Sequence, residues 1–69
     1  MEKLTKMLDY YLGLATSPIF EGHKEWIYHQ AFGAVDYHIW VYPEDAQLVY
    51  ELWLTYRPRF EKAIWGVGE

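Results

Sequence analysis

Two histidines and an aspartate near the middle of the chain have the types and spacing to bind a metal ion. His29 and His38 flank a central Gly33-Ala34 pair, and Asp36 lies just before the second histidine. A glycine at the first position fits a two-residue type II′ hairpin turn. That turn would place the two imidazoles opposite each other on paired strands, with Asp36 one diagonal step away. Two neutral histidines and a carboxylate make an open three-ligand site for zinc or a similar cation.

The same histidines have a simpler interpretation, as polar residues of an amphipathic strand that takes part in an interface. The metal site depends on one strand register, and a slip of one residue would send the two side chains to opposite faces. We therefore predict no metal ion and no cofactor, and keep metal or ligand binding by the cross-strand histidine pair as the alternative.

An antiparallel β-hairpin over residues 25–42 is the element that would position these histidines. Apolar residues recur there with a period of two, which is typical of strands. The face expected to cover the core contains Trp26, Tyr28, Gln30, Phe32, Val35, Tyr37, Ile39 and Val41. The opposite face contains Glu25, Ile27, His29, Ala31, Asp36, His38, Trp40 and Tyr42.

Helices are expected on both sides of the hairpin. Over residues 2–15 the apolar positions have helical spacing, and Ser17-Pro18 should end that helix. A second helix should begin at Pro43, followed by two acidic residues, and end near Gly66. Pro58 should kink or break it near Arg57. The sequence thus predicts an α+β fold of order α-β-β-α, with the hairpin packed on two helices in one compact domain, residues 1–69.

Length and composition exclude several classes of protein. The chain has 69 residues, no cysteine and a net charge of −4, with only six lysines and arginines. It therefore lacks the basic face of a nucleic-acid-binding protein, and it cannot form disulfides. We expect no nucleic-acid partner and no membrane association, since the apolar positions near the N-terminus are interrupted by charges. Absence of cysteine favours a cytoplasmic location.

An enzyme is not expected either. The sequence contains no nucleophile elbow, phosphate-binding loop, dinucleotide fingerprint or zinc-protease motif. A chain of this length also has little room for a pocket that would shift the pKa of an acid or base.

The aromatic content points to binding instead. Fourteen of the 69 residues are Trp, Tyr or Phe, more than one small core can hide. We expect the surplus to form a partner-binding surface on the second hairpin face, made of Ile27, His29, His38, Trp40 and Tyr42. The sequence therefore predicts a non-enzymatic protein–protein interaction module that forms a homodimer or binds another protein. Small acidic proteins of this kind are common among phage and mobile-element accessory proteins that bind and inhibit a host or defence protein.

Overall fold

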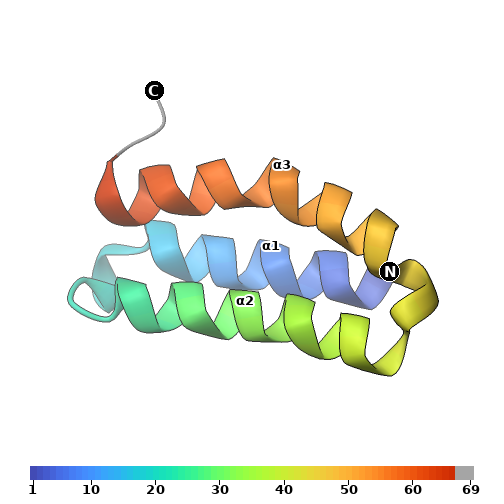
Figure 1. Cartoon of the computed structure of the whole chain (residues 1–69). Helices are drawn as coiled ribbons and strands as arrows, with labels where there is room; N and C mark the ends of the chain where they lie inside the picture. Colours follow the sequence, from blue (N-terminus) through green and yellow to red (C-terminus); the bar gives the residue numbers. More distant parts are fainter. Residues whose placement is uncertain (67–69) are drawn as a thin grey trace.

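Three α-helices follow one another along the chain in the computed structural model, which describes residues 1–66 (Figure 1). They are α1 (Glu2–Thr16), α2 (Lys24–Val41) and α3 (Ala46–Trp65). Two short 3-10 turns, η1 (Pro18–Phe20) and η2 (Pro43–Asp45), lie in the connections. The helices run side by side and alternate in direction, so the short connections join neighbouring helix ends.

The first helix agrees with the prediction. Leu4, Leu8 and Ala15 of α1 are buried, because they fall on one side of the helix. The helix ends where Pro18 follows Ser17, whose backbone is extended. The Ser17 hydroxyl oxygen then accepts a hydrogen bond of 3.3 Å from the amide of Ile19 and starts the next turn.

The predicted hairpin is wrong. Residues 25–42 lie almost entirely in α2, the Gly33-Ala34 pair is in the middle of that helix, and residues 1–66 contain no strand. Ile27, Ala31 and Val35 recur every four residues and form one buried stripe against the other helices. The fold is therefore all-α, and the α+β class predicted from the sequence does not hold.

The period of two had a physical origin that is not a strand. Apolar residues occur on every side of α2, so an alternating pattern can be found among them as readily as a helical one. Tryptophan, tyrosine, isoleucine and valine also favour strands intrinsically, but packing against α1 and α3 overrides that preference.

The third helix is continuous, which corrects the expected break near Pro58. Pro58 lies inside α3 on its exposed side, where the missing amide costs one hydrogen bond to the Leu54 carbonyl but causes no clash with the core. The helix ends as predicted at Gly66, whose φ of +70° is left-handed and whose amide donates to the Lys62 carbonyl.

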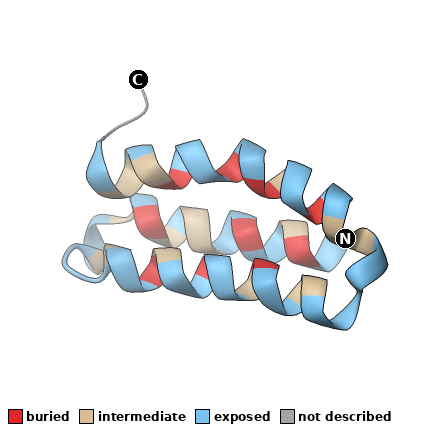
Figure 2. Cartoon of the chain, in the orientation of Figure 1, coloured by how far each residue is buried: buried red, intermediate tan, exposed pale blue. Residues whose placement is uncertain are grey.

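One core lies between the three helices, and Figure 2 shows the buried residues on the sides that face one another. The largest fully buried side chains are Leu8, Ile27, Val49 and Phe60, contributed by all three helices. Every pair of helices is in contact. No helix of the described part of the chain is both long and apolar enough to cross a bilayer.

Two polar contacts fix how the helices sit against one another. The buried Tyr56 hydroxyl of α3 donates a hydrogen bond to the Asp9 carboxylate of α1. This bond, together with burial, raises the pKa of Tyr56 above its ordinary value, although nearby Arg59 opposes the change. Lys24 Nζ donates to the Ala63 carbonyl at 3.3 Å and so ties the start of α2 to the end of α3.

Candidate functional site

The five residues predicted to bind a partner do not form one surface. Ile27 is fully buried in the core and is unavailable to any partner. His29 and Trp40 lie on the outer side of α2, while His38 is half-buried on the other side of that helix. Tyr42 follows the helix and places its ring 5.0 Å from the His38 ring. The hairpin face that was to unite them does not exist in this fold.

The histidine pair cannot chelate a metal ion. His29 and His38 are nine residues apart on one helix, which places them about two and a half turns apart and on opposite sides. Their separation along the axis is about 13 to 14 Å, whereas zinc needs its ligands within about 2 Å. Within residues 1–66, no group of three histidines or carboxylates is arranged to hold a cation.

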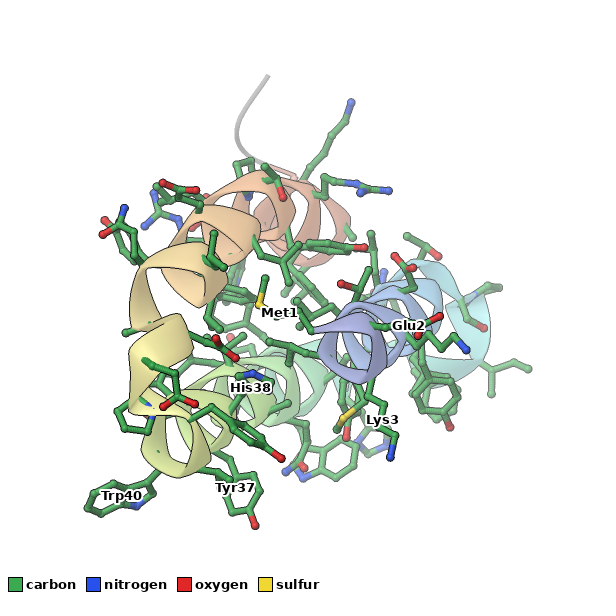
Figure 3. The ribbon with its side chains drawn as sticks, turned by 90° about the vertical axis from the view of Figure 1, so that its right-hand side faces the viewer. Met1, Glu2, Lys3, Tyr37, His38 and Trp40 are labelled. Carbon is green, nitrogen blue, oxygen red and sulfur yellow. The ribbon has the colours of Figure 1, made fainter. Side chains whose placement is uncertain are left out.

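His38 has a structural role at the end of the bundle. Its Nε2 lies 3.3 Å from the Asp45 carboxylate, which links α2 to η2 across the turn at Pro43. A hollow beside this pair is bordered by Met1 and by Glu2 and Lys3 at the start of α1 (Figure 3).

A different set of α2 residues does form one surface, and we call it the outer stripe. Its members are Trp26, His29, Gly33, Tyr37 and Trp40. Successive members are three, four, four and three residues apart, the spacings that keep side chains on one side of a helix. All five are exposed, and they lie opposite the buried residues Ile27, Ala31 and Val35.

The outer stripe carries the most accessible aromatic side chains of α2. Trp40 is 82% exposed, Tyr37 is 68% exposed and Trp26 is 57% exposed. Figure 3 shows the side chains of Tyr37 and Trp40 pointing away from the bundle, into solvent. Large aromatic rings left in water on one helix side are typical of a binding surface, because their burial contributes much of the binding energy at protein interfaces.

Large aromatic side chains therefore lie on the outer side of α2 as well as on its inner side, unlike on an ordinary surface helix. The helices α1 and α3 cover only the inner side. The outer stripe is the side left over.

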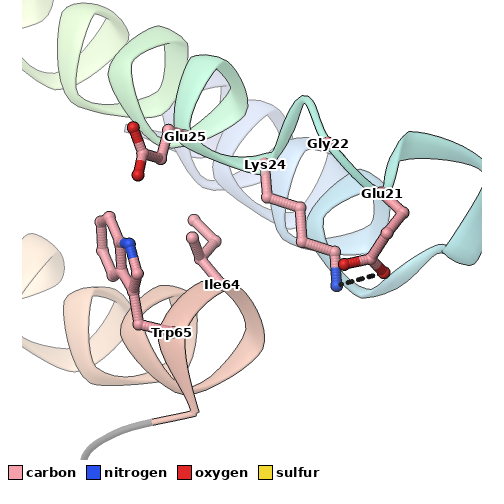
Figure 4. Close-up of a pocket in the computed structure, with 6 residues that line it drawn as sticks. All are labelled: Glu21, Gly22, Lys24, Glu25, Ile64 and Trp65. Atoms are coloured by element: carbon pink, nitrogen blue, oxygen red, sulfur yellow. Dashed lines mark ion pairs between the residues drawn. The ribbon is translucent and has the colours of Figure 1, made fainter.

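A hollow at the opposite end of the bundle has a structural explanation. Glu21, Lys24, Glu25 and Trp65 border it, together with Gly22 and Ile64 (Figure 4). Lys24 Nζ lies 3.5 Å from the Glu21 carboxylate and also donates to Ala63. Its charge is thus already used within the chain.

Of the three cations near Pro58, Arg57 lies apart from Arg59 and Lys62, which border one hollow together with Lys24. Arg57 pairs with Glu61 at 3.4 Å, while the guanidinium of Arg59 lies 5.1 Å from the centre of the Tyr56 ring. Being two residues apart, the two arginines point to nearly opposite sides of the helix.

Sequence reasoning missed Trp26, Gly33 and Tyr37, because the hairpin placed the two aromatics on the core face and the glycine in the turn. The signal that would have found them is the symmetric three-four-four-three spacing, which fits a helix and not a strand. Comparisons of the chain with models of protein families, with curated proteins and with solved structures gave no match.

Proposed function

We propose that this chain is a non-enzymatic protein-interaction module that binds its partner through the outer stripe of α2. The observation that carries the proposal is the gathering of Trp26, Tyr37 and Trp40 on one accessible helix side. Tryptophan and tyrosine dominate binding hot spots because they bury a large area at a small cost in side-chain entropy. The rigid bundle behind α2 would present them without reorganisation on binding.

The composition of the surface around the stripe supports a protein partner. Its flanks carry Gln30 and Asp36, both exposed, so an aromatic centre has a polar rim. This is the usual anatomy of a protein–protein interface.

Photo-crosslinking from the edge of the stripe tests the proposal. A photoreactive amino acid in place of Gln30 should crosslink the chain to a bound protein in cells, with a discrete product on a gel. The same amino acid in place of Gln47, an exposed glutamine of α3, is the matched control and should give little product.

A second substitution makes the result specific. Adding Trp40→Glu to the Gln30 crosslinking variant should remove the product, because a carboxylate would then have to be desolvated at the centre of the interface. Equal products from positions 30 and 47, or a product indifferent to Trp40→Glu, would refute binding through the outer stripe. Circular dichroism should confirm that every variant remains helical.

A further inference from the structure

Resting on the proposed function, we infer that the outer stripe binds a second copy of this chain, with the two α2 helices antiparallel and related by a two-fold axis at Gly33. The spacing of the stripe carries the inference, since it reads the same in both directions from that glycine. A two-fold interface must be self-complementary, with each residue meeting one at the mirrored position. Trp26 would lie against Trp40 of the second copy, and His29 would lie at the same level as Tyr37 of the second copy, on the opposite edge of the stripe.

Gly33 is the second observation, because the fold of one copy gives no reason for a glycine there. Its φ is not positive, and a methyl group added to it would meet no atom within 4 Å. A glycine inside a helix costs about 0.5 to 1 kcal/mol relative to alanine. In the proposed dimer Gly33 lies on the axis, where the two helices approach most closely and a missing side chain lets them do so.

Charge is complementary in this arrangement. His29 and Asp36 lie on the same edge of the stripe, seven residues and about 10 Å apart, too far to touch within one copy. Because Gly33 lies nearly midway between them, the antiparallel rotation brings Asp36 of the second copy beside His29, and it does so twice. On the other edge Gln30 comes beside Tyr37 of the second copy, where the Tyr37 hydroxyl can donate a hydrogen bond to the side-chain oxygen of Gln30.

The accessible area suits a small dimer. Given the exposed fractions of Trp26, Tyr37 and Trp40, these three side chains present on the order of 400 to 500 Å². Specific interfaces bury about 600 to 1,000 Å² on each partner, and the flanking residues of an 18-residue helix supply the remainder. The dimer thus falls at the lower end of that range, where association depends on concentration.

The first test is a dilution series of the purified protein by sedimentation equilibrium, from about 1 µM to about 1 mM, a range that brackets a weak dimer. We expect reversible conversion from monomer to dimer. A chain that remains monomeric throughout overturns the inference.

A charge exchange tests the register. His29→Asp places two carboxylates beside each other across the interface and should weaken the dimer about tenfold, since like charges at an interface cost affinity. Adding Asp36→Lys should restore association to about the wild-type value, because each Lys then meets an Asp of the other copy. The rescue requires the antiparallel register, since positions 29 and 36 do not meet within one copy. A double variant no better than His29→Asp overturns the register.

Gly33→Lys tests the axis, since it would bring two ammonium groups together there and should prevent dimerisation. Gly13→Lys is the matched control: Gly13 is also an exposed helical glycine with open space around it, on α1. The control should dimerise as the wild type does, and equal behaviour of the two variants overturns the inference.

Failure of the inference and failure of the proposed function are distinguishable. A strict monomer whose Gln30 crosslinks to a different protein, in a manner sensitive to Trp40→Glu, disproves the self-association but supports the interaction module. Absence of any product from position 30, both in cells and in purified protein at the highest concentration of the dilution series, disproves both.

Discussion

The inner and outer sides of α2 carry comparable apolar residues but differ completely in what covers them. On the inner side Ile27 is fully buried, and the Trp53 ring of α3 packs against rings of α2. On the outer side Trp40, which has the same side chain as the buried Trp53, is largely exposed to water. Residue type alone therefore does not decide burial in this bundle. The inner side stabilises the fold of one chain, and the outer side is left accessible to solvent.

The largest expected effect is the difference in unfolding free energy between truncating a side chain on the inner side of α2 and truncating one on its outer side. Ile27→Ala should lower the free energy of unfolding by about 2 to 5 kcal/mol, because it leaves a cavity in the core. Trp40→Ala should change it by no more than about 0.5 kcal/mol, since the ring has few contacts to lose. Urea denaturation followed by circular dichroism, on dilute samples that contain only monomer, measures both. Comparable losses would show that the outer stripe is part of the monomer's core.

Replacing tyrosine with phenylalanine compares Tyr56, whose hydroxyl is hydrogen-bonded within the fold, with Tyr37 of the outer stripe. Tyr56→Phe should destabilise the fold by about 1 to 2 kcal/mol, because it deletes the hydrogen bond to the Asp9 carboxylate. Tyr37→Phe on the outer stripe should have almost no effect on the monomer. Midpoints of thermal unfolding at neutral pH give the comparison, and a larger shift for Tyr37→Phe would contradict it.

The Tyr56 variant should also change the response to alkali. The folded state raises the pKa of Tyr56, so it holds the proton more tightly than the unfolded chain does. That stabilisation is fully present below the unfolded pKa of about 10 and disappears as pH rises through the higher folded value. Wild type should therefore lose more stability than Tyr56→Phe above pH 10, in unfolding curves recorded across that range. Parallel losses would argue against the hydrogen bond.

The smallest expected change in stability compares two glycines, Gly33 and Gly66, that differ in backbone conformation. Gly33→Ala should stabilise the monomer by about 0.5 to 1 kcal/mol, because the site is helical and open. Gly66→Ala should instead destabilise it by about 1 kcal/mol, because its left-handed backbone is strained for any residue with a Cβ. The two shifts in unfolding midpoint should thus have opposite signs. A loss of monomer stability in Gly33→Ala would mean that the fold itself needs this glycine.

Prediction from the sequence succeeded where one side of a helix is polar. The first helix has a single apolar side, and the last begins after Pro43 and ends at Gly66, so local signals and periodicity agree there. At Pro58 the expected break does not occur: the helix continues through the proline, whose ring lies on the exposed side and so displaces no core side chain.

The middle of the chain was mispredicted because it is apolar on two sides. Because large apolar residues lie on both the inner and the outer side of α2, the sequence fits a strand period of two as well as a helical period of 3.6. Gly33-Ala34, in the middle of the helix, was therefore misread as a hairpin turn. Of the predicted surface, His29 and Trp40 lie on the outer stripe, and Ile27 lies in the core. The excess of aromatic residues predicted that some aromatic side chains would be exposed, but which ones they are could be known only once the helix was known.

The short connections between the helices set an order of events. A bundle whose contacts are mostly local folds in about microseconds to milliseconds, and the links at η1 and η2 keep neighbouring helices close in sequence. Encounter between two proteins at micromolar concentration takes about 0.1 to 10 s at ordinary association rates. In the proposed complex, a newly made chain would therefore close its inner side long before its outer stripe meets a partner, so binding would join chains that are already folded.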